Sequence, residues 1–386
     1  GFEALCANQT GGGHTAVGAE ALKTNTGVQN TAIGHRALCS NSSGACNVAL
    51  GRQALCSNTS ANYNTALGHS SMLKNTEGFS NTAVGLYSLA CNTTGDAHVA
   101  IGYEALLNNT TADCNTAVGC KAMRANTTGN NNTAIGLMAL DANDDSDSNT
   151  AVGHSSLTSS DTSNNTAVGF ETLACTTSGF GTAVGYRAMK ANTTSSGSTA
   201  MGYQAMCANT TGSNNTAFGL EALKTNISGS GNTAVGRDAL ELNTASNNTA
   251  VGYAALLANT TGPDNVAIGC GSLLDNTEGL ENTAVGARSL PNNTTASYNT
   301  SIGKDSMFYN TTGTNNVSVG RKTLEDNTTG VENTAVGTGA LNSNTTGIHN
   351  TGIGNASLVA QNGASCFNTA LGSQSGLDVT TGDNNI

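Results

Sequence analysis

The sequence is poor in most of the residues from which ordinary globular domains are built. It has no tryptophan, two prolines, 4% aromatic residues and 10% charged residues. So few large side chains cannot fill the two or three conventional cores that 386 residues would otherwise suggest. A disordered chain is equally excluded, because disorder needs high charge or abundant proline.

Positive charge is also scarce. The formal net charge is −11, with 14 lysines and arginines in the whole chain and no basic run. This excludes the electrostatic pattern of nucleic-acid binding and of attachment to an anionic membrane surface. No apolar run approaches the ~18–20 residues of a membrane-spanning helix, so we expect no membrane insertion in this segment.

What the chain has in abundance is one short repeat. A four-residue block that usually reads Thr-Ala-aliphatic-Gly recurs 22 times between Thr15 and Thr369, most often every 17 residues. A fixed short period indicates units that stack on their neighbours, so we expect residues 1–386 to form a single uninterrupted array. The chain enters the repeat partway at Gly1 and leaves it partway at Ile386. We therefore expect a segment of a longer chain or fibre.

Each position of the repeat has its own chemistry, counted from the first residue of the block as position zero. Position two is aliphatic or Met except at Phe218, and position seven is Leu or Met until Gly376. Columns that never carry a charge are typical of a core, so we expect both to point inward. Position zero alternates between Thr and Val and should share the side of position two on a short strand, with the Ala of position one on the other side. Position three is always Gly, which predicts a turn out of the strand.

An α-solenoid is the competing architecture, but its helices need uninterrupted runs of ten or more residues. Here Gly and the common Asn-Thr-Thr-Gly turn break every such run. The sequence therefore predicts an all-β protein, a parallel β-solenoid (β-roll or β-helix) with one coil of ~17 residues per repeat and about 22 coils. Successive coils should lie about 4.8 Å apart.

Three blocks led by Asn or His resemble a known family: Val48-Ala49-Leu50-Gly51, Val99-Ala100-Ile101-Gly102 and Val266-Ala267-Ile268-Gly269. They are similar to the head repeats of YadA-like trimeric autotransporter adhesins. The longer form beginning at Asn282 also resembles tail-fibre-like NTAxGxxAL repeat arrays. The resemblance implies a left-handed solenoid, a trimer, and a role in surface display or attachment. This repeat is longer than the adhesin repeat, and no heptad stalk or anchor accompanies it.

Asn-x-Ser/Thr sequons are the most frequent candidate sites, 23 in all. On a surface turn they would be N-glycosylation acceptors and would coat the protein in sugar. Four positions, Asn75, Asn143, Asn243 and Asn276, keep the Asn without the sequon, which indicates a structural role as well. The candidates at position ten are Asn8, Asn41, Asn58, Asn92, Asn109, Asn126, Asn192, Asn209, Asn226, Asn259, Asn293, Asn310, Asn327 and Asn344.

Cysteine occurs eleven times, without the spacing of a metal site. Cys39 and Cys56 share position eight of adjacent coils, where Cα atoms about 4.8 Å apart would permit a disulfide. We expect no metal site and no cofactor. Unpaired thiols are the alternative for this pair.

No catalytic residues are predicted, because the histidines fall in different columns without recurring partners and no nucleophile or phosphate-loop motif is present. We expect a structural extracellular or cell-surface fibre protein that associates with itself as a filament or homo-oligomer, a trimer among the options, and that carries covalent glycans. The alternative is the shaft of a surface adhesin or phage-type tail fibre. A third option is an ice-binding solenoid, which displays regular Thr columns on a flat face; the expected inward direction of position zero argues against it.

Overall fold

The computed structural model describes residues 1–361 and 363–386, and these contain strands, turns and bends but no helix. The chain divides into two compact units, Gly1–Thr194 and Ser195–Ile386. Each is a parallel β-solenoid in which every coil contributes one three-residue strand. The predicted fold class is therefore confirmed.

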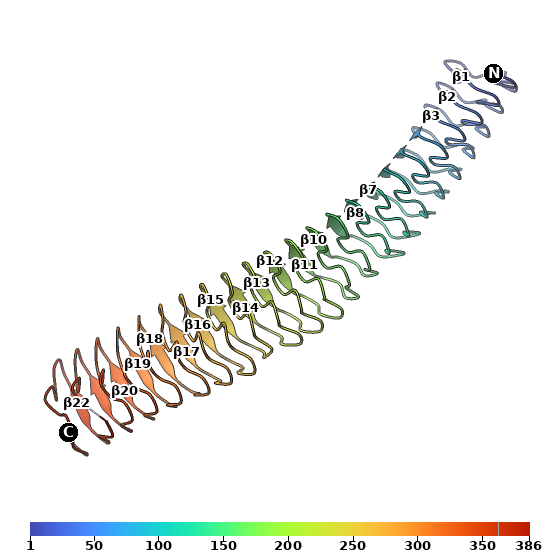
Figure 1. The fold of residues 1–386 in the computed structure, drawn as a ribbon. Coiled ribbons are helices and arrows are strands. Elements are labelled where there is room, and N and C mark those ends of the chain that lie inside the picture. Colours follow the sequence, from blue (N-terminus) through green and yellow to red (C-terminus); the bar gives the residue numbers. More distant parts are fainter. Residues whose placement is uncertain (362) are drawn as a thin grey trace. The chain divides into compact units, whose positions relative to one another are not determined.

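In the first unit, eleven strands pair in sequence order, each parallel to the next (Figure 1). They are β1 (Thr15–Val17), β2 (Thr31–Ile33), β3 (Val48–Leu50), β4 (Thr65–Leu67), β5 (Thr82–Val84), β6 (Val99–Ile101), β7 (Thr116–Val118), β8 (Thr133–Ile135), β9 (Thr150–Val152), β10 (Thr166–Val168) and β11 (Thr182–Val184).

The second unit repeats this arrangement with eleven further strands. They are β12 (Thr199–Met201), β13 (Thr216–Phe218), β14 (Thr233–Val235), β15 (Thr249–Val251), β16 (Val266–Ile268), β17 (Thr283–Val285), β18 (Thr300–Ile302), β19 (Val317–Val319), β20 (Thr334–Val336), β21 (Thr351–Ile353) and β22 (Thr369–Leu371).

The pairing has no register offset, so equivalent residues of successive coils lie one above another. Thr82, Ala83 and Val84, for example, pair with Val99, Ala100 and Ile101. We call each such line a column and number it from the first strand residue, column zero; column sixteen is the residue directly before the next strand. Every side chain thus has its own equivalent as neighbour on both sides, about 4.8 Å away.

The interior is assembled from small, large and amide columns. Leu or Met of column seven fills the centre and is fully buried, as at Leu106 and Met123. Ala of column one and Ala, Ser or Thr of column six complete the apolar part, as at Ala100 and Ala105. Asn of columns ten and sixteen closes the other end of the coil. The inward direction predicted for column seven is confirmed.

The direction predicted for the strand residues was wrong. Every strand from β2 to β21 buries its middle residue and leaves its first and third residues at least partly exposed. The reason is space: a coil of ~17 residues is narrow, and the column-seven Leu already occupies its centre. Only a side chain as small as Ala fits opposite it. The aliphatic column two therefore faces outward although it never carries a charge.

Column three must be Gly for two reasons that the structure makes visible. At Gly34, φ is +139°, which side chains rarely adopt, and a Cβ would lie 2.4 Å from the carbonyl oxygen of Gly51 in the next coil. The same close approach recurs at Gly119 against Gly136. A single methyl group here would push neighbouring coils apart.

Candidate functional site

The most distinctive surface is the outer face of the strands, formed by columns zero and two, which we call the strand face. Column zero is Thr or Val and column two is aliphatic, Met or Phe in all 22 strands, so the face carries no charge. Its apolar side chains range from half-buried, as at Val84 and Val118, to well exposed: Leu50, Ile101 and Ile135 keep 41%, 38% and 40% of their surface in solvent. The register of the sheet makes each column continuous along a unit.

A contiguous apolar face of this kind is unusual on a soluble monomer, where such patches are generally small or mark an interaction site. Its neighbours in sequence cannot cover it, because column three turns the chain away and the rest of the coil lies behind the strand. The strand face is therefore the candidate interaction surface of the molecule.

The position-ten asparagines lie inside the coil, not on it. In thirteen of the fourteen sequon candidates the side chain is fully buried, Asn8 being the partly exposed exception. The Nδ2 atom, to which a glycan would be attached, is used for packing: that of Asn58 donates to Asn41 Oδ1 at 2.6 Å and to the carbonyl oxygen of Ala61 at 3.1 Å. Surface acceptors at column ten do not fit the folded coil. The buried sites are Asn41, Asn58, Asn92, Asn109, Asn126, Asn192, Asn209, Asn226, Asn259, Asn293, Asn310, Asn327 and Asn344.

The same ladder continues where the sequon is absent, which explains why Asn persists there. Asn75 donates from Nδ2 to the carbonyl oxygen of Gly78 at 2.9 Å and accepts from Asn92 at 2.7 Å. A second ladder runs along column sixteen, where the Oδ1 of Asn47 accepts from the backbone N–H of Asn64 at 2.9 Å. These amides satisfy the turn carbonyls that the narrow coil would otherwise bury unpaired.

Cys39 and Cys56 occupy column eight of consecutive coils, and both are buried as free thiols. Burial raises the pKa of the Cys56 thiol, with the neighbouring Cys39 acting in the same direction. A thiol with a raised pKa is a poor nucleophile at neutral pH. The pair is thus placed side by side, and the disulfide stays a prediction.

Charged side chains gather on a different surface, formed mainly by columns four, five and eight, which we call the charged face. Ion pairs link neighbouring coils there: Glu171 lies 2.9 Å from Arg187 and 2.6 Å from Lys190, and Arg124 lies 3.3 Å from Asp141. These ion pairs were not predicted from the sequence. The missed signal was the spacing of 16 to 20 residues between opposite charges, which places them on adjacent coils.

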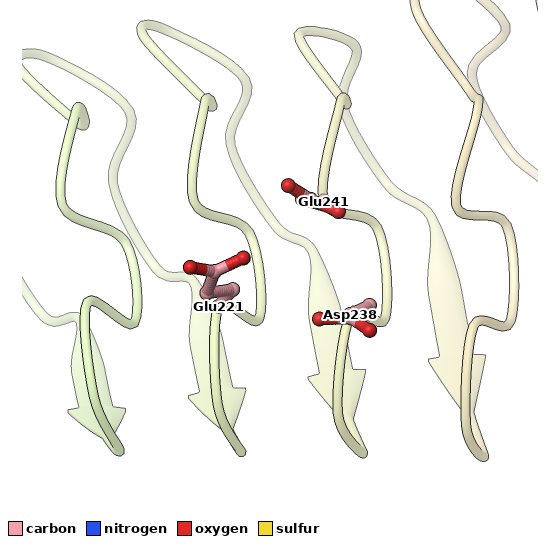
Figure 2. A group of neighbouring side chains, drawn as sticks. All are labelled: Glu221, Asp238 and Glu241. Atoms are coloured by element: carbon pink, nitrogen blue, oxygen red, sulfur yellow. The ribbon is translucent and has the colours of Figure 1, made fainter.

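Three carboxylates of the charged face come together in the second unit. Glu221, Asp238 and Glu241 offer oxygen atoms within 4.8 Å of one another, from the coils that begin at β13 and β14 (Figure 2). Two cations pair with them: Lys224 lies 3.1 Å from Glu221 and 3.6 Å from Glu241, and Arg237 lies 3.0 Å from Asp238. The hydrogen bond to Glu221 raises the pKa of Lys224. This arrangement is an ion-pair network of the protein's own side chains.

No protein-family model matches the chain, and no curated protein is detectably similar to it. A search of the described residues for a helix long and apolar enough to cross a membrane finds none. The strand face and the charged face are therefore the features of this chain that point to a function.

Proposed function

We propose that this chain is a structural module of an extracellular fibre, and that it assembles by packing its strand face against copies of itself. The observation that carries the proposal is the outward direction of column two. It gives each unit an uncharged line of aliphatic side chains about 50 Å long, since eleven strands lie about 4.8 Å apart. Burying such side chains contributes roughly 25 cal/mol for each Å² removed from water.

A second copy is the best-fitting partner, because it presents the same columns at the same spacing. Two identical periodic faces can stay in register over a whole unit, whereas an unrelated globular surface could match only a few coils. The strand face itself holds no charged side chain, so the contact places no like charges directly against each other. Assembly as a trimer would agree with the resemblance to YadA-like head repeats.

The experiment is to measure the mass of the folded chain in solution by light scattering and to image it by electron microscopy. The variant Ile101→Lys/Ile135→Lys places two charges on the strand face. Its matched control, Leu86→Lys/Leu137→Lys, replaces two column-four leucines of similar exposure, 41% and 42%. We expect assembly in the native chain and the control, and loss of assembly in the strand-face variant, with circular dichroism unchanged in all three. A native chain that stays monomeric would overturn the proposal.

An adhesin or tail-fibre shaft uses the same assembly, so it remains the alternative within this proposal. Electron microscopy distinguishes them: long filaments support a fibre, whereas oligomers of fixed length that end in a distinct knob support a shaft.

We propose that glycans are attached at the exposed sequons and not at the buried ones. Six sequon asparagines are exposed in the folded chain: Asn108, Asn131, Asn164, Asn214, Asn247 and Asn355. Glycopeptide mass spectrometry of material secreted by eukaryotic cells tests this directly, with occupancy expected at these sites and none at buried column ten. Sugar confined to column ten would overturn it.

Ice binding is a second candidate, favoured by the outward direction of column zero. Thr occupies this column in every strand except β3, β6, β16 and β19, so its hydroxyl groups form a regular line beside the aliphatic column two. This is the arrangement that Thr columns have on ice-binding solenoids. Thermal hysteresis in a monomeric chain would support this candidate over self-assembly, and its absence would remove it.

A further inference from the structure

A second surface of the molecule stands out independently of the strand face. In the coils that begin at β17, β18 and β19, the charged face forms an open groove with a volume of about 340 Å³. Four of the chain's 14 lysines and arginines line it: Arg288, Lys304, Arg321 and Lys322. Only two carboxylates, those of Asp305 and Glu325, are among its lining residues.

Both carboxylates already form ion pairs, with Arg288 and Lys322. Asp305 pairs with Arg288, with Oδ1 and Nη2 2.7 Å apart. Glu325 receives Lys322 Nζ on Oε1 at 2.9 Å and the Nδ2 of Asn342 on Oε2, also at 2.9 Å. Within the part of the chain that the structure describes, Lys304 and Arg321 consequently form no ion pair.

Lys304 and Arg321 also stand in an unfavourable relation to each other. Both occupy column four, in consecutive coils, so their backbones are direct neighbours in the stack. Across all 14 lysines and arginines, no other two share a column in consecutive coils. Like charges placed directly opposite each other on neighbouring strands destabilise the pairing. An anionic group held between them would turn this repulsion into two attractive contacts.

Aromatic rings lie beside this cationic pair. The rings of Phe308 and Tyr309 meet edge to face with their centroids 4.8 Å apart, and Tyr309 is 51% exposed. Arg288 stacks over Phe308 at 5.4 Å, which holds that ring in place. A flat exposed ring next to unpaired cations suits a ligand that has both an apolar face and a negative group.

We propose that this groove binds an acidic saccharide, whose carboxylate or sulfate is held by Lys304 and Arg321 while a sugar ring packs on Tyr309. Either anionic group would make the same charge-assisted contacts with the two cations, and the experiment distinguishes a carboxylate from a sulfate ligand. A nucleic acid is a poor fit, because one patch of four cations on a chain of net charge −11 lacks the continuous basic surface that a phosphate backbone needs.

The test is calorimetry at low salt with three probes: an oligogalacturonate, a sulfated heparin oligosaccharide, and inorganic sulfate. We expect one or both saccharides to bind, with affinity falling as salt is added, because the contact is exposed and charged. Lys304→Gln and Arg321→Gln should each weaken binding about tenfold, the effect of losing one charge-assisted contact. Tyr309→Ala should weaken the saccharides and leave inorganic sulfate unchanged.

The matched control is Arg52→Gln, which removes a column-four cation that has no Lys or Arg above or below it. Circular dichroism checks that every variant is folded. Binding of neither saccharide, or equal losses in Arg52→Gln, would overturn the proposal. Equal affinity for inorganic sulfate with no effect of Tyr309→Ala would overturn the assignment to a sugar. The strand face takes no part, so none of these outcomes bears on self-assembly.

Discussion

Asn109 donates a hydrogen bond from Nδ2 to the Oδ1 of Asn92, 2.8 Å away in the preceding coil. The same relation links Asn126 to Asn109 at 2.9 Å and Asn143 to Asn126 at 2.7 Å. A buried ladder of identical amides makes each coil depend on the next, because replacing one rung, such as Asn109, leaves the Oδ1 of the preceding amide, Asn92, without this donor. The free energy of unfolding lost when one of these Asn residues is replaced therefore measures how much the ladder contributes to stability.

Asn259 separates the structural role of the ladder from the sequon. Asn259→Ala removes bonds to Asn243 Oδ1 at 2.7 Å and to the Gly262 carbonyl at 2.9 Å, and should lower the free energy of unfolding by about 2–3 kcal/mol. Thr261→Ala destroys the sequon but leaves these bonds, so it should change stability by less than about 0.5 kcal/mol. Urea unfolding of both variants checks this. If Asn259→Ala changed the free energy of unfolding as little as Thr261→Ala, the ladder would not contribute to stability.

His98 should make stability depend on pH. It replaces Asn in column sixteen, accepts from the backbone N–H of Asn115 on Nδ1 at 3.2 Å, and lies 2.6 Å from the Ala112 carbonyl through Nε2. Burial lowers its pKa below the usual value near 6.5, so the folded protein holds it neutral. The unfolded chain binds the proton first. This contribution is therefore complete above pH 6.5 and is lost as the pH falls below 6.5.

The variant His98→Asn restores the usual column-sixteen residue and removes this dependence. The difference in unfolding free energy between native chain and variant should change by at most about 1.4 kcal/mol per pH unit in that acid range. Chemical unfolding measured between neutral and acid pH tests it. A difference that stays constant across the range would show that His98 takes up its proton equally in both states.

Two glycines test whether space or backbone conformation fixes the repeat. Gly119→Ala places a Cβ 2.4 Å from the Gly136 carbonyl at φ +137°, so we expect a loss of at least about 3 kcal/mol or failure to fold. Gly339→Ala has φ +67° but nothing within 4 Å, and should cost only about 1–2 kcal/mol. Thermal unfolding ranks the two. The reverse order would contradict the close approach of coils at column three.

Cys39 and Cys56 provide a redox test. Mild oxidation should join them, because they are neighbours in one column, and closing a loop of 17 residues should raise the free energy of unfolding by about 3 kcal/mol. Peptide mapping by mass spectrometry locates the bond, and Cys39→Ser serves as the control that should gain nothing. Persistence of both thiols under oxidation would rule the disulfide out.

Much of the architecture could be predicted, because the same residue types recur at the same positions of every repeat. The invariant Gly of column three, the Leu or Met of column seven and the Asn-Thr-Thr-Gly turn are enough to derive a parallel solenoid with one short strand per coil. The structural role of Asn at Asn75 and Asn143 was also recoverable, since the residue persists where the sequon is lost. Those inferences rest on which residues a column tolerates.

Which strand side chains point inward and which point outward could not be predicted in the same way. Column two looks like a core column because it never carries a charge, yet a surface kept for contact with a partner would show the same tolerance. Side chains alternate on a strand, so the choice between Ala and Val as the inward residue depends on the width of the coil. That width depends in turn on how far the column-seven Leu reaches across it.

The sequence by itself determined the period, the fold class and the line of amides, because each follows from one residue type recurring at one spacing. Only the tertiary structure decided which face of the strand is outside, that the position-ten Asn side chains are buried, and that Lys304 and Arg321 form no ion pair within the described residues. The physical reason is the same in each case. Stacking brings residues 17 positions apart into contact, and what a side chain meets there depends on coils that its own repeat does not contain.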